Sequence, residues 1–295
     1  MKKNQIVLLV IIMTLISSFS TGISSGQSAK EIMVKVQKVA KESFSTSIQR
    51  IKLSSCKYTI SNKRIVCTEE ARNKLLESIA KNYGDDDQDS RSVSIIIDPK
   101  KEQGVGMLTY EYGELGKDND SWIYLPELSK VKRLASSKDS NDNGGSFFGS
   151  EFSLEDMEDL KIDEYTFKIL GEENYKGRDT WVIEYIPTPE RAKKSKYNKT
   201  VSWIDKERYI SLKKNLYIGG SHYKQLTMSE VEKIDNVWVA RKLTMNNLDT
   251  KTISIMKMVS VAFNQEVSDE FLTPRTLEDY TFRERNLTRL RDNLK

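Results

Sequence analysis

The chain reads Trp122-Ile-Tyr-Leu-Pro126, then Lys130-Val-Lys-Arg-Leu134, and after a polar segment Phe147-Phe-Gly-Ser-Glu-Phe-Ser-Leu-Glu-Asp156. Aromatic and branched residues favour a first strand, which Pro126 ends, and the basic segment continues as a second strand. Ser153 followed by Asp156 is typical of the capped start of a short helix. The stretch therefore predicts a strand, a turn, a second strand, a polar loop and a short helix.

Aromatic rings gather around one flexible point in this stretch, because Phe147, Phe148 and Phe152 surround Gly149. Two interpretations are open. The rings cap a hydrophobic core, or they form a movable apolar gate over an internal cavity.

The region around this stretch has short alternating segments separated by turn-forming residues, which predicts strands. We expect strands at 93–98, 104–112, 121–125, 130–134, 164–170, 180–186, 200–205, 210–218, 222–233, 237–246 and 251–263. Roughly eleven strands in meander order predict a mainly β fold, with an antiparallel sheet that is strongly curved or closed rather than flat. Alternation places Trp181 and Ile183 on one face, and Ile253 and Ile255 on one face with Val261.

The same residues carry a resemblance to a known family. The segments Trp122–Arg133 and Phe147–Met157, with Asp98-Pro99, Trp203-Ile-Asp205 and Lys224, resemble the LolA-like family of outer-membrane lipoprotein-sorting proteins. Glu151 stands where that family usually has Asp. The resemblance covers about 92–277 and implies a half-barrel whose open concave face is covered by helices. It also implies an apolar cavity that accepts acyl chains.

Residues 1–26 are typical of a secretory signal peptide, because Lys2 and Lys3 precede an apolar run that is too short to span a bilayer comfortably. Cleavage near Gly26 and a periplasmic location are expected, and an uncleaved anchor is the alternative. Residues 27–43 then predict an amphipathic helix, with Ile32, Val36 and Val39 on one side.

Residues 27–91 precede the half-barrel segment and contain both cysteines. We expect a hairpin around Ser61-Asn62-Lys63, flanked by Cys56 and Cys67. Two cysteines in an exported chain favour a disulfide, with two free buried thiols as the alternative. Residues 69–82 predict a second helix that packs on the sheet through Leu75, Leu76 and Ile79. Residues 278–295 predict a charged C-terminal helix that packs weakly or frays.

Several function classes find little support in the composition. The formal net charge is +4, and residues 1–26 contribute Lys2 and Lys3 and no acid, which leaves +2 and argues against nucleic-acid binding. His222 is the only histidine, so neither a Ser-His-Asp site nor a zinc site is indicated. We therefore expect a noncatalytic protein without cofactor or metal.

These observations lead to one functional hypothesis, a periplasmic carrier or chaperone for acyl chains of lipoproteins or other lipids. Its partners are expected to include an inner-membrane exporter of the resistance–nodulation–division type and an outer-membrane acceptor. The alternative is a secreted β-rich binding or structural module accessory to an exporter. The expected apolar cavity and gate residues are Met33, Val36, Trp122, Tyr124, Leu125, Phe147, Phe148, Phe152, Trp181, Ile183, Met245 and Ile255.

Overall fold

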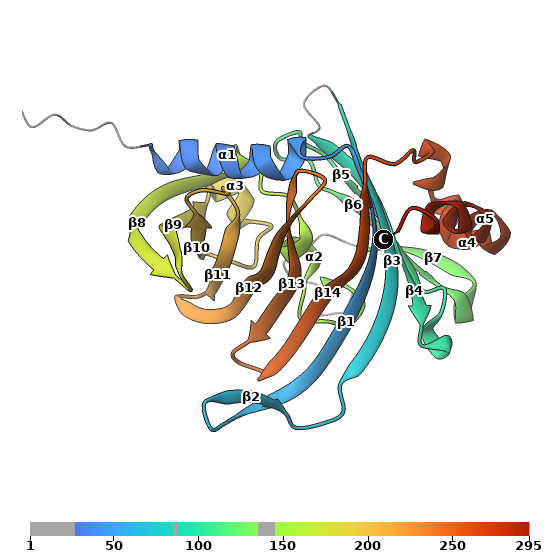
Figure 1. Cartoon of the computed structure of the whole chain (residues 1–295), viewed down its shortest axis with the longest axis horizontal. Helices are drawn as coiled ribbons and strands as arrows, with labels where there is room; N and C mark the ends of the chain where they lie inside the picture. Colours follow the sequence, from blue (N-terminus) through green and yellow to red (C-terminus); the bar gives the residue numbers. More distant parts are fainter. Residues whose placement is uncertain (1–26, 85–87, 135–144, 295) are drawn as a thin grey trace, which may run out of the picture.

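The computed structural model describes residues 27–84, 88–134 and 145–294. Within these residues the dominant feature is one strongly curved, open antiparallel sheet of fourteen strands (Figure 1). Its strand order is β7-β6-β5-β4-β3-β1-β14-β13-β12-β11-β10-β9-β8, and β2 pairs with β1 alone. The predicted mainly β, half-barrel architecture is confirmed. The signal peptide predicted at 1–26 lies outside the described residues.

Helices and strands have the following bounds. The strands are β1 Thr46–Ser61, β2 Arg64–Cys67, β3 Arg72–Tyr83, β4 Asp89–Asp98, β5 Gly106–Glu111, β6 Asp120–Leu125, β7 Lys130–Leu134, β8 Tyr165–Tyr175, β9 Arg178–Pro187, β10 Lys199–Asp205, β11 Ser211–Ile218, β12 Ser221–Ile234, β13 Val237–Asn247 and β14 Thr252–Phe263. The helices are α1 Ala29–Glu42, α2 Leu154–Met157, α3 Pro189–Ala192, α4 Pro274–Glu278 and α5 Tyr280–Arg291.

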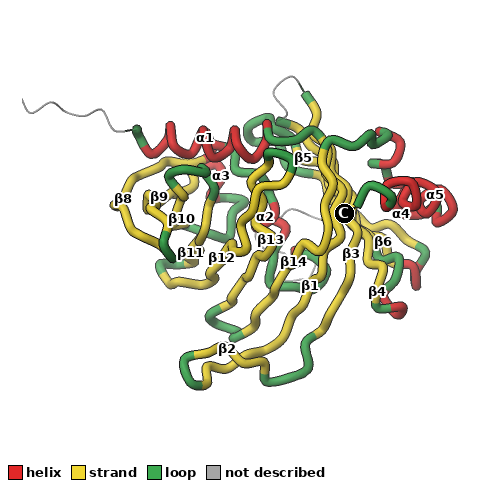
Figure 2. Tube along the Cα trace, viewed as in Figure 1, coloured by secondary structure: helices red, strands yellow, loops and turns green. Residues whose placement is uncertain are grey.

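Helix α1 lies along one end of the curved sheet, on its concave side (Figure 2). Ser28 and Glu31 form a capping box at its start, which satisfies backbone N–H groups that have no partner inside the helix. Its apolar stripe packs Ile32 and Met33 against Ile183 of β9 and Ile204 of β10. The amphipathic helix predicted at 27–43 is therefore confirmed.

The C-terminal helices cover part of the convex face. Asp279 caps α5, whose Leu287 and Leu290 are buried against the cluster formed by β3, β4 and β5. Gly106 makes this approach possible, because a Cβ there would stand 2.8 Å from the Leu277 side chain of α4. The expectation of a weakly packed C-terminal helix was wrong, since its leucines complete a second core on the outside of the sheet.

The helix predicted at 69–82 was also wrong, because this segment forms the strand β3 between β1 and β4. Leu76 faces the concave core and Ile79 faces the convex core. Since apolar residues are buried on both faces, the strand lacks the simple alternation of a half-exposed strand. The 27–91 segment thus supplies two central strands of the sheet rather than a layer packed on it.

The hairpin predicted around 61–63 is confirmed as β1 and β2, with Asn62 and Lys63 at positive φ in its turn. Cys56 and Cys67 form a disulfide across its base. The bridge packs with Tyr58 and Ile253 on the convex side of the sheet. The hairpin projects beyond the neighbouring strands (Figure 1).

Candidate functional site

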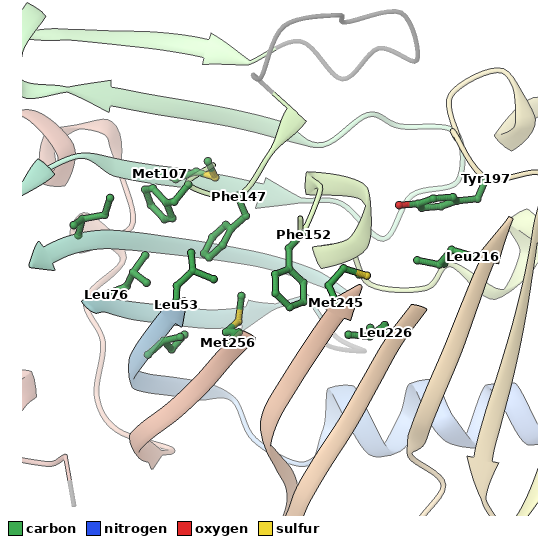
Figure 3. Packing of buried hydrophobic residues seen from close by; sticks show 13 residues of the cluster. Leu53, Leu76, Met107, Phe147, Phe152, Tyr197, Leu216, Leu226, Met245 and Met256 are labelled. Carbon is green, nitrogen blue, oxygen red and sulfur yellow. The ribbon is translucent and has the colours of Figure 1, made fainter. Parts of the chain in front are cut away.

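A segment of chain fills the middle of the concave face, and we call residues 147–158 the plug. It follows β7 in the chain and includes α2, which lies inside the curve of the sheet (Figure 1). Phe147 and Phe152 point toward Leu53, Met245 and Met256 of the sheet (Figure 3). The three plug phenylalanines are all buried in this cluster. The aromatic stretch that the sequence singled out is thus an internal filling of the half-barrel.

The plug contains a tight turn in a rarely populated conformation. The Ser150 N–H donates to the Phe147 carbonyl at 3.1 Å, with φ of +49° at Phe148 and +73° at Gly149. Glycine adopts such angles freely, whereas a bulky residue at positive φ costs about 1–2 kcal/mol. Such a conformation persists only where surrounding contacts hold it.

Those contacts are polar and come from several strands. The Lys74 ammonium donates to the Phe148 carbonyl at 2.8 Å, and the Lys224 ammonium donates to the Glu151 carbonyl at 2.6 Å. The Glu151 N–H donates to Ser254 Oγ at 2.8 Å. Two lysines of the sheet therefore hold the backbone of the plug, which makes it a separately anchored element rather than part of the sheet.

One cavity, of about 370 Å³, lies between the plug, the end of α1 and the concave faces of β1, β3, β4, β5, β6, β13 and β14. We call it the Met–Ser cavity. Its apolar wall is formed by Ile51, Met107, Phe147, Leu243, Met256 and Met258. Its volume lies within the range of about 300–1,000 Å³ that is typical of ligand sites.

The Met–Ser cavity also has many hydroxyl groups in its lining. Ser90, Ser92 and Ser94 of β4 all line it, and Ser78 of β3 and Thr109 of β5 add a hydroxyl from each neighbouring strand. These hydroxyl groups were not predicted as lining residues, although serines at alternate positions are a signal of one strand face. The cavity is therefore amphipathic, and not the uniformly apolar space that we expected.

A second cavity, of about 210 Å³, lies between α1 and strands β9 to β12. We call it the Tyr–Lys cavity. Its lining includes Met33, Val36, Tyr165, Tyr185, Tyr197 and Lys214. The two cavities share Ala40, Lys41, Glu158 and Asp159 as lining residues, so they adjoin where the end of α1 meets the end of the plug.

Ionisable groups cluster at this junction. Asp159 pairs with Lys41 of α1 at 2.5 Å, and its N–H donates to Glu111 of β5 at 3.4 Å. Burial and the charge of Asp159 raise the pKa of Glu111 to about 8, with Lys41 opposing the shift. Glu158 accepts from Arg191 at 2.8 Å, yet burial still raises the pKa of its carboxyl. The junction thus holds a carboxyl whose raised pKa favours its protonated form.

Most of the predicted site residues lie on the concave side. Met33 and Val36 line the Tyr–Lys cavity, and Trp181 and Ile183 pack beside them under α1. Phe147 lines the Met–Ser cavity, while Phe148, Phe152 and Met245 belong to the adjoining cluster. Leu125 is on the concave face by alternation with Ser121 but is not part of either cavity lining.

Three predicted site residues lie on the other face. Trp122 and Tyr124 pack against the convex core beneath α4 and α5, with Tyr110 edge-on to Trp122 at 5.0 Å. Ile255 packs beside the disulfide on the convex face. The prediction that Ile255 and Val261 share one face was wrong. The β1–β14 register shifts between Arg50 and Ile51, and this shift places the two residues on opposite sides of the sheet.

The open curved sheet, the covering helix α1 and the internal cavities define a LolA-like half-barrel. A domain from Vibrio parahaemolyticus described as an outer membrane lipoprotein-sorting protein is 26% identical, with a TM-score of 0.71 over 85% of this chain and 98% of that one. A DUF1329 family protein from Desulfovibrio piger is 25% identical, with a TM-score of 0.73 over 84% and 97%. A LolA superfamily protein from Nitrosomonas europaea shares the fold at 15% identity, with a TM-score of 0.59 over 84% and 98%.

A family model described as "Uncharacterized protein" matches residues 88–279, and the chain belongs to that family. The LolA-like resemblance inferred from the sequence is confirmed by the structural matches. No curated protein matches the chain. None of the helices in the described ranges has the length and apolar character that crossing a membrane requires.

Proposed function

We propose that this protein is an exported, noncatalytic carrier that binds the acyl chains of lipoproteins or other lipids. The observation that supports the proposal most strongly is the Met–Ser cavity within a LolA-like half-barrel, adjoining a plug that fills the remaining interior. Methionine side chains suit such a site, because they are flexible and repack around apolar groups of different shape.

Uptake of a chain is proposed to require movement of the plug, with α1 as the accompanying lid. Phe147, Phe148 and Phe152 occupy apolar space that acyl methylenes would fill, so ligand and rings compete for the same surfaces of β1, β13 and β14. Burial of acyl chains is favourable by about 0.8 kcal/mol per methylene, which a carrier must return on release. Reinsertion of the plug rings supplies an apolar surface that offsets this loss.

The proposed location is the periplasm. The proposed partners are an inner-membrane exporter of the resistance–nodulation–division type and an outer-membrane acceptor. The lipoprotein-sorting description of the Vibrio parahaemolyticus domain supports this proposal.

A secreted β-rich binding or structural module accessory to an exporter is the second candidate. The convex side favours it, because the disulfide-bonded hairpin leaves Ile60 and Ile65 exposed as a directly paired couple. This candidate needs no internal ligand, and the two proposals therefore separate on whether lipid occupies the interior.

The test is native mass spectrometry of the protein purified as residues 27–295, followed by organic extraction of whatever co-purifies. We expect bound lipid or acylated protein, and uptake of a fluorescent fatty acid by the emptied protein. Ala80→Phe should abolish this binding, because Ala80 lines the Met–Ser cavity between the small residues Ser47 and Ser92 of the adjacent strands.

Thr166→Phe is the matched control, since Thr166 is exposed on the edge strand β8 and a ring there leaves the cavity empty. Circular dichroism and the melting temperature establish that both variants fold. A protein that contains no lipid and takes up no fatty acid would overturn the carrier proposal in favour of the binding module.

A further inference from the structure

Lys214 is a cation that faces the interior and has no carboxylate partner among the residues that the structure describes. It lies on β11 opposite Ser202 of β10 and Leu226 of β12, and all three line the Tyr–Lys cavity. Its neighbour in the chain, Lys213, has the opposite orientation and lies 3.8 Å from the centroid of the Trp203 ring. The register thus sends one lysine of the pair into the half-barrel and the other out of it.

The acidic residues of the Tyr–Lys cavity are already engaged with other groups. Glu155 accepts from Ser195, Asp156 accepts from Tyr197 and pairs with Lys224, Glu158 pairs with Arg191, and Asp159 pairs with Lys41. In the described part of the chain Lys214 forms neither a hydrogen bond nor an ion pair, and Asp156 and Asp159 affect it only through their more distant charges.

An interior ammonium without a partner is costly, since burial disfavours the charged form. Burial accordingly lowers the pKa of Lys214, and the charges of Asp156 and Asp159 only partly oppose this effect. Other interior lysines avoid the cost through direct contacts, as Lys224 does with the Glu151 carbonyl at 2.6 Å. Lys214 would gain most from an anion that enters the cavity.

We propose that the Tyr–Lys cavity is a head-group site, in which Lys214 binds the carboxylate or phosphate of an anionic amphiphile. The apolar part of such a ligand contacts Met33, Val36 and Leu216, which line the same cavity. The rest of the ligand's alkyl chain extends into the adjoining Met–Ser cavity, past the shared lining residues Ala40 and Lys41. This inference rests on the proposed lipid-carrier function and specifies its ligand class.

The experiment compares three ligands with the same twelve-carbon chain: dodecanoate, dodecyl phosphate and dodecanol. Binding to lipid-free protein is measured by displacement of a fluorescent probe at neutral pH. We expect at least one of the anions to bind about tenfold or more tightly than the alcohol, which is the effect of one charge-assisted hydrogen bond. The two anions distinguish a carboxylate source from a phosphate source.

Lys214→Met should abolish the preference for the anion over dodecanol, whereas Lys213→Met should retain this preference. The melting temperature of ligand-free Lys214→Met should equal or exceed that of the wild type, because the variant removes an unpaired interior charge. A lysine needed only for the fold would instead lower it.

The outcomes separate the two proposals. If chains bind but the anions bind no better than the alcohol, or if Lys214→Met retains the preference, the head-group site is wrong and the carrier stands. If the wild type binds none of the three ligands, the carrier proposal itself fails.

Discussion

Glu77 joins the sheet to the C-terminal helix. Its carboxylate is 2% exposed on the convex face of β3 and accepts from Arg291 of α5 at 2.7 Å and from Arg50 of β1 at 2.8 Å. Burial alone would raise the pKa of this carboxyl, but the hydrogen bonds from Arg291 and Arg50 outweigh it and lower the pKa. One residue thus fixes the position of α5 on the outside of the half-barrel.

We expect Glu77→Gln to lower the free energy of unfolding by about 1.5–3 kcal/mol, the usual contribution of a hydrogen bond to a charged group. Both arginines are partly exposed, so water solvates them in the variant and limits the loss. Urea denaturation at neutral pH measures the effect, with the exposed Glu278→Gln as the control.

The contribution of Glu77 to stability depends on pH with a definite sign. Because the folded-state pKa of Glu77 is lowered, its stabilising contribution is present above the unfolded carboxyl pKa of about 4.3 and is lost as the pH falls through the folded value. The stability difference between wild type and Glu77→Gln should therefore shrink in acid. A difference that stays constant down to the acid transition would contradict this account.

At the scale of elements, the plug is held by its contacts with the sheet more than by its own structure. Its helix α2 is a single turn, whose start is fixed by the Ser153–Asp156 capping box. Lys224, which is 6% exposed, donates to the Glu151 carbonyl and pairs with Asp156 at 3.5 Å. Lys224 therefore links β12 to both halves of the plug.

Lys224→Met should release the plug locally while the sheet remains folded. We expect amide hydrogens in residues 147–158 to exchange roughly tenfold faster or more, because the lost charge-assisted contacts total at least about 1.4 kcal/mol. Amide exchange followed by mass spectrometry measures this. The control is Lys242→Met, because Lys242 lies on the convex face of β13, away from the plug. Equal acceleration in the strands of the sheet would mean global destabilisation instead.

The sequence predicted many elements correctly and failed for identifiable reasons. Alternation and turn residues located the strands between 93 and 263, because β4 to β7 and β8 to β14 each follow one another as adjacent antiparallel strands. β3 was predicted as a helix instead of a strand, because apolar residues occupy both of its faces and hide the alternation of a strand. Trp122 was assigned to the cavity because the sequence does not reveal that α4 and α5 cover the convex face.

The candidate site was less predictable than the fold. The sequence identified the phenylalanines around Gly149, but their position inside the half-barrel depends on contacts from Lys74, Lys224 and Ser254, which are remote in the chain. Lys214 carries no local signal at all. Its significance arises only when strand register and the pairing of four distant carboxylates are known together.

At the scale of the whole molecule, the junction between the two cavities makes the folded protein lose stability as the pH rises from acid toward neutral. The folded-state pKa of Glu111 is raised to about 8 by burial and by Asp159. Between the unfolded carboxyl pKa of about 4.3 and this value, the folded protein binds a proton that the unfolded chain lacks, so stability falls as the pH rises.

Glu111→Gln should therefore match the wild type near pH 4 and become the more stable protein as the pH approaches about 8, in melting temperatures measured across this range. Glu114→Gln is the control, because Glu114 is exposed and lies just beyond the end of β5. Parallel curves for Glu111→Gln and the wild type would show that Glu111 is already ionised at neutral pH.

The ends of the strand order have a mechanical consequence. In the described ranges β7 and β8 each pair with a neighbour on one side only. In a closed cylinder, widening the interior would break ladder hydrogen bonds along a seam, but here the two edges can separate while every existing strand pair stays bonded. The sheet can therefore open and close by bending, and the width of its interior can adjust to the size of the ligand that it encloses.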